Sequence, residues 1–135
     1  MKKIFLDTNV IIDFMGEREG FFDNAARIIC DADKSLINIA CSSLSFSNIA
    51  YILRIEYTYE EIKSKLSLFS QICEITKVDK DVVKKALESK YTDFEDALQY
   101  YSAISAGADC IVTRNVKDFK EYIIPVITPA EYLQM

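Results

Sequence analysis

Acidic, amide and hydroxyl side chains gather in three short segments of the chain, each next to an apolar run. The candidates for chemistry are Asp7, Thr8 and Asn9 in FLDTN, Asp93 and Asp96 in YTDFEDAL, and Thr113, Asn115 and Asp118 in TRNVKDF. The sequence has no histidine, which excludes imidazole bases, Ser-His-Asp and Cys-His catalysis and the commonest zinc ligand. Any chemistry therefore depends on carboxylates, amides, hydroxyls, Lys, Arg or a metal ion.

Carboxylates that folding brings together need a partner that offsets their repulsion. Two carboxylates about 4 Å apart repel by ~1 kcal/mol in water and ~4 kcal/mol at an intermediate dielectric. A cation, a shared proton or hydrogen bonds can offset this repulsion. With oxygen ligands only, the sequence favours Mg²⁺ or Mn²⁺, which bind one or two carboxylates and leave room for a phosphate oxygen. Such an ion activates water for attack on a phosphodiester and neutralises charge in the transition state.

The elements that position these residues follow from the alternation of apolar patterns. Short β-branched runs predict strands at residues 3–7, 37–41, 73–78, 109–113 and 125–128. Helical patterns occupy 21–33, 43–55, 59–70, 79–89 and 93–106, with short helices beginning near Val10 and at Pro129. This alternation predicts βαβ crossovers and a parallel sheet with helices on both faces. The carboxyl ends of such strands form the ligand-binding edge, so Asp7 and TRNVKDF are expected to be neighbours.

Length and composition predict one cytosolic domain that spans residues 1–135. Acidic residues outnumber basic ones by 21 to 16, and the net charge of −5 opposes non-specific attraction to nucleic acid. No apolar run is long enough for a membrane span. The cysteines stand alone in apolar segments, which indicates reduced core residues rather than disulfides or zinc ligands. They are Cys30, Cys41, Cys73 and Cys110.

Each acid also has a structural interpretation. Asp7 can cap the helix that follows it, and Asp13 is expected on a solvated helix face. Thr92 and Glu95, or Asp93 and Asp96, have capping-box spacing. At roughly 100° per residue Asp96 lies about 60° from Asp93, whereas Glu95 points about 160° away and is expected outside the site. The predicted core stripe of this helix is Phe94, Leu98, Tyr101 and Ser105.

The chain resembles the PIN domains, and among them the small prokaryotic members related to VapC-type toxins. The resemblance covers nearly the whole chain, through FLDTNVIIDF at 5–14, DFEDALQYYSAISAGADCIVTRNVKDF at 93–119 and PVITPAEYL at 125–133. It implies a three-layer α/β/α fold with a five-stranded parallel sheet. It also implies a ribonuclease site of acidic residues that depends on Mg²⁺ or Mn²⁺.

Carried over by position, the resemblance makes Asp7 and Asp96 the central metal ligands and Asp93 an additional acid. Thr8 and Asn9 are expected to orient Asp7. The TRNVKDF segment is expected to supply the last acidic or amide contact and groups near the phosphate. Asn115 and Asp118 are expected to supply that contact, and Thr113, Arg114 and Lys117 are expected near the phosphate. Ordinary surface charge is the alternative interpretation of Arg114 and Lys117.

One position departs from the family pattern. PIN domains usually place a Glu on the helix after the second strand, but SSLSFSNIAYILRIE has Asn48 at the equivalent position. An amide oxygen can coordinate a metal or hold a water, but it lacks the negative charge of Glu. Asn48 is therefore expected either in the site wall or as a satisfied buried amide, with weaker metal binding.

The implied function is hydrolysis of single-stranded or looped RNA, as the toxin of a toxin-antitoxin pair. The implied partners are RNA, an antitoxin protein and a second copy of the chain, with Phe21, Phe22, Tyr57 and Tyr59 as candidate interface residues. Asn48 supports an alternative, a catalytically weak binding module that pairs with a regulatory protein. A phosphoaspartyl enzyme with Asp7 as acceptor is weaker, because Asn9 breaks the expected D-x-D spacing.

Overall fold

Five parallel strands form the centre of the molecule. The computed structural model describes residues 2–121 and 123–135. The strands are β1 Lys3–Leu6, β2 Asn38–Ser42, β3 Cys73–Thr76, β4 Cys110–Val112 and β5 Val126–Ile127, in the spatial order β3-β2-β1-β4-β5. All five predicted strands are therefore present, and β1, which leads to Asp7, is the central one.

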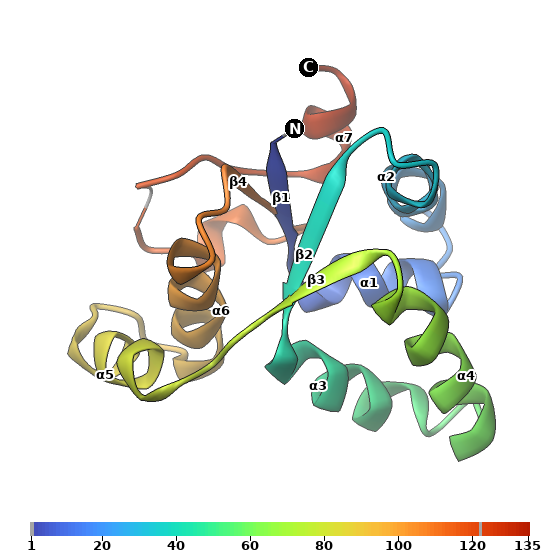
Figure 1. Cartoon of the computed structure of the whole chain (residues 1–135), viewed down its shortest axis with the longest axis horizontal. Helices are drawn as coiled ribbons and strands as arrows, with labels where there is room; N and C mark the ends of the chain where they lie inside the picture. Colours follow the sequence, from blue (N-terminus) through green and yellow to red (C-terminus); the bar gives the residue numbers. More distant parts are fainter. Residues whose placement is uncertain (1, 122) are drawn as a thin grey trace.

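Helices cover both faces of the sheet, which confirms the predicted α/β/α arrangement (Figure 1). They are α1 Thr8–Met15, α2 Phe22–Asp33, α3 Ser43–Leu53, α4 Tyr59–Ser70, α5 Lys80–Glu88, α6 Phe94–Ser105 and α7 Pro129–Leu133. Alternate residues of β1 separate two cores. Ile4 and Leu6 pack with residues of α1 to α4, whereas Phe5 packs with Tyr100 and Ala103 of α6. In the described residues no helix is both long and apolar enough to cross a membrane.

Two central strands pass into helices without a connecting loop. Asp7 follows β1 and caps α1, and Ser42, the last residue of β2, caps α3 by accepting the backbone N–H of Ser45. Both caps have extended backbone angles, and the hydroxyl oxygens of Thr8 and Ser45 lie 2.7 Å apart. The N-termini of α1 and α3 therefore begin side by side at the carboxyl edge of the sheet.

The expected burial of α6 and of one cysteine is wrong. In α6 the buried side chains are Ala97, Leu98, Gln99, Tyr100, Ser102 and Ala103, whereas Phe94 is 47% exposed. The helix is covered by the sheet on one side and by α5 on another, so its buried surface is wider than a single stripe. Cys30 is exposed, although all four cysteines are free thiols and Cys41 and Cys110 are buried as expected. The Sγ atoms of Cys41 and Cys73 lie 3.8 Å apart, so these two cysteines do not stand alone.

Candidate functional site

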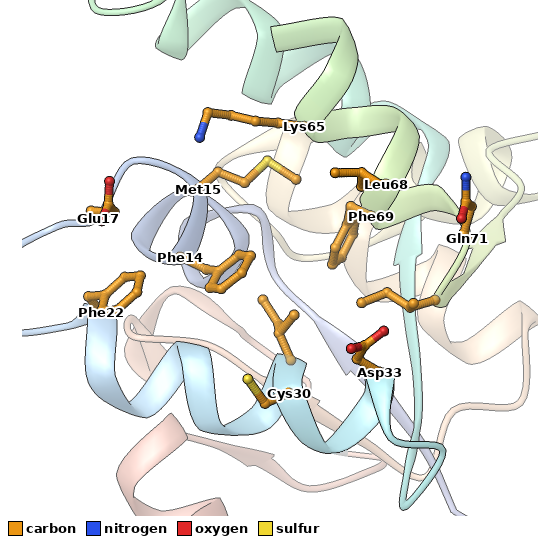
Figure 2. Close-up of a pocket in the computed structure, with 12 residues that line it drawn as sticks. Phe14, Met15, Glu17, Phe22, Cys30, Asp33, Lys65, Leu68, Phe69 and Gln71 are labelled. Carbon is orange, nitrogen blue, oxygen red and sulfur yellow. The ribbon is translucent and has the colours of Figure 1, made fainter. Parts of the chain in front are cut away.

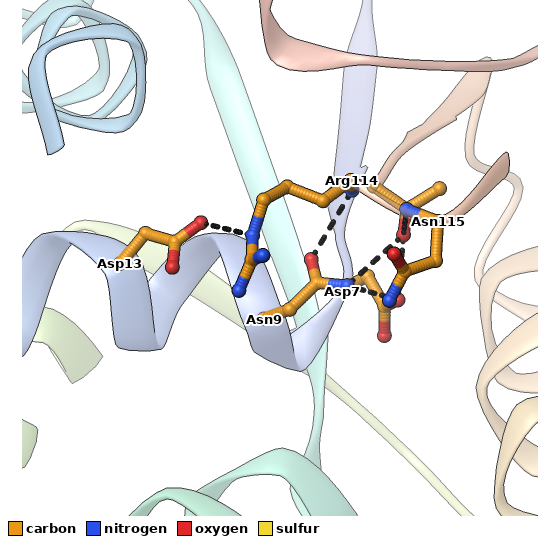
Figure 3. A network of polar contacts seen from close by, with 6 residues as sticks. Asp7, Asn9, Asp13, Arg114 and Asn115 are labelled. Atoms are coloured by element: carbon orange, nitrogen blue, oxygen red, sulfur yellow. Dashed lines mark hydrogen bonds and ion pairs between the residues drawn. The ribbon is translucent and has the colours of Figure 1, made fainter. Parts of the chain in front are cut away.

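Asp7 lies at the end of β1, close to Asn9 and Asn115 (Figure 3), and accepts three hydrogen bonds. One carboxylate oxygen accepts the backbone N–H of Thr8 at 2.8 Å, and the other accepts the Thr113 hydroxyl at 2.8 Å and the Asn9 amide at 3.4 Å. The residue is 8% exposed. Burial raises the pKa of Asp7, the hydrogen bonds from Thr113 and Thr8 lower it, and the charge of Asp118 raises it. Asp7 is thus a helix cap and also a fixed carboxylate.

The TRNVKDF segment is both a turn and one wall of this site. Thr113 is fully buried, and its hydroxyl oxygen also accepts the amide of Asn9 and the backbone N–H of Asn115. Asn115 then opens a single 3-10 turn, Val116–Asp118. Asp118 lies close enough to raise the pKa of both Asp7 and Asp96. The segment therefore delivers Asp118 to the acidic group that begins at Asp7.

The N-terminus of α6 adds further carboxylates. Asp93 is the cap of this helix and accepts the backbone N–H of Asp96 at 3.1 Å. Asp96 is half-buried, and burial raises its pKa to about 7, with further contributions from the charges of Asp93, Asp7, Asp118 and Glu95. Three segments that lie far apart in the sequence thus bring their acids into one electrostatic neighbourhood.

Glu95 belongs to this neighbourhood, contrary to the expectation that it points elsewhere. Its Oε1 accepts a hydrogen bond of 2.9 Å from the Asn48 amide on α3. Burial, Asp93 and Asp7 raise the pKa of Glu95, and the bond from Asn48 lowers it. The expected direction of Glu95 is wrong because Asp93 has extended cap angles, so the helical step of roughly 100° does not apply from it. The half-buried Asn48 is therefore a partner of a site carboxylate.

A hydrogen-bond network of uncharged side chains links α1, α3 and α6. Gln99 is 1% exposed, and its amide donates to the hydroxyls of Thr8 at 3.0 Å and Ser45 at 3.1 Å. Its carbonyl oxygen accepts the hydroxyl of Ser42 at 2.7 Å. The hydroxyl of Thr8 thus belongs to this network. Thr8 contacts Asp7 through its backbone N–H instead. Nothing in the sequence pattern distinguished Gln99 from the other residues of its helix.

Asp13 is buried at 1% exposure, so its expected solvated position is wrong. The Nε of Arg114 pairs with Asp13 Oδ2 at 2.7 Å, and this partner, 101 residues later in the chain, makes burial of the carboxylate tolerable. Figure 3 shows the Arg114 side chain extended along α1 toward Asp13. Lys117 is exposed on the 3-10 turn. Of the two proposed phosphate contacts, only Lys117 is not engaged by an acid in the described residues.

The acidic group suits a hard divalent ion in ligand type. Within residues 2–121 and 123–135, the ion pairs leave Asp7, Asp93, Asp96 and Asp118 without a basic partner. Burial is the largest cause of the raised pKa of Asp96, and this uncompensated repulsion raises it further. No three acidic or cysteine side chains of the described residues stand together in a ready metal cage. Coordination would therefore require surface side chains such as Glu95 to turn inward.

The fold and this acidic edge define a PIN domain. The family model of the PIN domain matches residues 3–117, and the chain belongs to the PIN domain family. Ribonuclease VapC1 of Aquifex aeolicus is 28% identical over an alignment of 138 positions, which covers 98% of this chain and 94% of that protein.

Solved structures show the same fold. A chain of a toxin-antitoxin complex from Klebsiella pneumoniae superposes with a TM-score of 0.70 at 21% identity, covering 93% of this chain and 97% of that one. VapC20 of Mycobacterium tuberculosis, a toxin that cleaves the sarcin-ricin loop, superposes with a TM-score of 0.63 at 14% identity, covering 80% and 86%.

Proposed function

We propose that this chain is an endoribonuclease that depends on Mg²⁺ or Mn²⁺ and hydrolyses RNA as the toxin of a toxin-antitoxin pair. The observation that carries the proposal is the buried Asp7, held by Thr8 and Thr113 at the end of β1. Beyond the effect of burial, Asp118 raises the pKa of Asp7, and Asp7 and Asp118 both raise the pKa of the half-buried Asp96. Similarity to the ribonuclease VapC1 supports the reaction class. The test is cleavage of a labelled RNA with Mn²⁺ or Mg²⁺ and with a chelator, and cleavage that persists in the chelator would reject metal dependence.

Each residue of the site has a role in this reaction. A hard divalent ion, when bound, supplies water activation and charge neutralisation. Asp7 and Asp96 would hold the ion, because Asp7 is buried and fixed by hydrogen bonds and Asp96 is half-buried close to it. Thr113 and Asn9 fix the orientation of Asp7. Asp118, Asp93 and Asn115 border the space where attacking water would be oriented, and Lys117 would contact a phosphate of the RNA.

Glu95 replaces, in this proposal, the carboxylate that Asn48 lacks. The Asn48 amide holds Glu95 at 2.9 Å, so the charge that the family pattern places on α3 comes instead from α6. This arrangement weakens the case for a catalytically weak binding module, which rested on Asn48. The residue at the family position is Asn48 instead of Glu, but the Glu95 carboxylate lies within hydrogen-bonding distance of Asn48.

Moving the carboxylate from residue 95 to residue 48 tests the role of Glu95 in metal binding. Glu95→Gln is expected to weaken Mn²⁺ binding by about 10-fold, because loss of a supporting carboxylate typically costs 10- to 100-fold in metal affinity. Asn48→Glu in the same chain should restore the affinity, since it returns a carboxylate to the pair. Mn²⁺ titration calorimetry measures both, and Glu60→Gln on the exposed face of α4 is the control. If the chain with both substitutions does not regain Mn²⁺ affinity, Glu95 does not replace the carboxylate that Asn48 lacks.

An apolar groove offers a binding place for the antitoxin. The groove of about 560 Å³ lies between α1, α2 and α4, with Phe14, Met15 and Phe69 around it (Figure 2). We infer that it receives an apolar segment of an antitoxin, because similar chains were solved in toxin-antitoxin complexes. Glu17, Asp33 and Lys65 at its margin would orient that segment.

Leu68→Glu should weaken binding of a co-expressed candidate antitoxin by at least about 30-fold, as expected for a carboxylate placed in the centre of an apolar interface. Leu68 is 65% exposed, so the fold should be retained. Leu87→Glu is the matched control, because Leu87 is 70% exposed but lies on α5, outside the groove. Equal binding by both variants in calorimetry would place the antitoxin elsewhere.

A homodimer stays a prediction. Of the four aromatic residues expected at its interface, Phe21 and Tyr59 are exposed, whereas Phe22 and Tyr57 are half-buried. Phe22 stacks on Phe14, with ring centroids 5.9 Å apart, and lines the groove.

A further inference from the structure

Gln99 is a buried amide on the same face of α6 as two acids of the site. It lies three residues after Asp96 and four after Glu95, a spacing that puts side chains on one side of a helix. It is 1% exposed, and a buried amide destabilises a fold unless its donors and its acceptor find partners. The hydrogen-bonding groups of Gln99 therefore need partners inside the protein.

These partners are three hydroxyls at the starts of α1 and α3. The amide N–H groups donate to Thr8 at 3.0 Å and Ser45 at 3.1 Å, and the carbonyl oxygen accepts from Ser42 at 2.7 Å. The hydroxyls of Thr8 and Ser45 also bond each other at 2.7 Å, so Gln99, Thr8 and Ser45 form a closed ring. Because a hydrogen bond weakens steeply when it is bent, the ring resists movement of α6 relative to α1 and α3.

Each helix in the ring carries or holds part of the acidic site. Thr8 donates its backbone N–H to Asp7 at 2.8 Å, and α6 carries Asp96. α3 carries Asn48, whose amide holds Glu95 at 2.9 Å. The ring thus joins the segments whose carboxylates must converge on one ion.

Repulsion between the acids acts in the opposite direction. Burial, Asp93 and Asp7, in that order, raise the pKa of Asp96, so the charges of Asp7 and Asp96 favour separation of α6 from α1 when no cation is bound. The hydrogen bonds of Gln99 oppose that separation. An amide suits this position because it joins hydroxyls as donor and as acceptor without adding a further charge beside the acids.

We propose that Gln99 is a positioning residue that fixes the separation of Asp7 and Asp96 and thereby sets the affinity of the site for Mg²⁺ or Mn²⁺. The inference rests on the proposed metal-dependent function. Gln99 contacts neither the ion nor the RNA in this role, because hydroxyls of the protein occupy its amide. Its loss should therefore misalign the ligands of the ion without removing any of them.

Gln99→Met tests this role, because methionine is similar in length but makes none of the three hydrogen bonds. Mn²⁺ titration calorimetry should show an affinity about 10-fold lower than that of the wild type, the lower range for loss of a group that orients metal ligands. In RNA cleavage at saturating Mn²⁺, kcat should fall because the ligands are misaligned, while KM for the RNA stays the same. Ser45→Ala removes one acceptor of the amide and leaves Ser42 in place. It should also lower Mn²⁺ affinity, and it tests the role where Gln99→Met does not fold.

Ser102→Ala is the matched control on the same helix. Ser102 is fully buried, three residues after Gln99, and its hydroxyl bonds the Thr76 hydroxyl at 2.6 Å and the Lys77 carbonyl at 2.8 Å. These partners lie at the end of β3 and just after it, away from the ring around Gln99. Ser102→Ala should lower the melting temperature, as Gln99→Met does, but leave Mn²⁺ affinity unchanged.

The same measurements separate this inference from the proposed function. A lower melting temperature with unchanged Mn²⁺ affinity in Gln99→Met and Ser45→Ala, or an equal loss of affinity in Ser102→Ala, overturns the positioning role and leaves the nuclease. A wild type that binds Mn²⁺ but cleaves no RNA overturns the nuclease, and a lower affinity in Gln99→Met then still supports the positioning role. A wild type that binds no Mn²⁺ overturns both.

Discussion

Asp7→Asn is expected to lower metal-dependent RNA cleavage by at least about 100-fold, the lower range for loss of a positioned catalytic group, and to leave the fold intact. Asparagine is a good helix cap, so its oxygen can still accept the N–H of Thr8 or the hydroxyl of Thr113. The substitution removes the negative charge that an ion would need at the centre of the site. Initial cleavage rates of a labelled RNA in saturating Mn²⁺ measure the effect, and circular dichroism checks the fold.

The control for this substitution is Asp81→Asn. Asp81 is exposed on α5 and pairs with Lys85, so its loss changes the net charge equally without touching the site. It should cleave RNA at the rate of the unchanged chain. A rate for Asp7→Asn within twofold of this control would mean that Asp7 is only a helix cap.

Asp96→Asn is expected to have opposite effects on activity and stability. Cleavage should fall by about 100-fold, because the second of the two enclosed carboxylates is lost. The apo fold should become more stable at pH 8, because the substitution removes a charge that is disfavoured first by burial and then by repulsion from four carboxylates. Asp96 is half-exposed to solvent, which screens the repulsion, so we expect a gain of ~1 kcal/mol, or about 2 to 5 °C in melting temperature.

The pH dependence of this gain has a definite sign. The pKa of Asp96 is about 7 in the folded chain, above its ordinary value, so the folded state binds the proton more tightly than the unfolded state. Wild-type stability should therefore decline as the pH rises from about 4 to about 7. Asp96→Asn, which lacks the titrating group, should escape this part of the decline. The difference in melting temperature should vanish near pH 4 and be complete above pH 7.

Mn²⁺ should reverse the order of the melting temperatures of the wild type and Asp96→Asn. Millimolar Mn²⁺ binds the folded wild type and should raise its melting temperature above that of Asp96→Asn, because ligand binding stabilises the state that binds it. Thermal melts from pH 4 to pH 8, with and without Mn²⁺, contain both measurements. Parallel melting curves for the two chains across this range would contradict the shared acidic site.

Strand ends made much of the site predictable from the sequence. Asp7 and Thr113 each follow a short apolar run, and the ends of parallel strands meet at one edge, so their contact could be expected. The helix caps were equally readable, since Asp93 has the residue type and spacing of an N-cap. These features depend on local pattern and on the rules of parallel sheets.

The remaining features depend on contacts between distant segments, which a local pattern does not encode. Burial of Asp13 requires Arg114, and the position of Glu95 requires the Asn48 amide. Gln99 looks like any polar helical residue until three hydroxyls from two other helix starts surround it. Each of these side chains has a partner at least 47 residues away in the chain.

The bond between Thr113 and Asp7 also sets when the site can exist during synthesis. These residues are 106 positions apart, and the central strand β1 must pair with β4 before Asp7 is held. At a translation rate of about 5–20 residues per second, the ribosome needs roughly 5 to 20 s to reach Thr113 after Asp7 is made. A nascent chain therefore carries an incomplete acidic site until most of it has been translated. Under the proposed function, the ribosome that makes the chain would thereby be kept from early contact with ribonuclease activity.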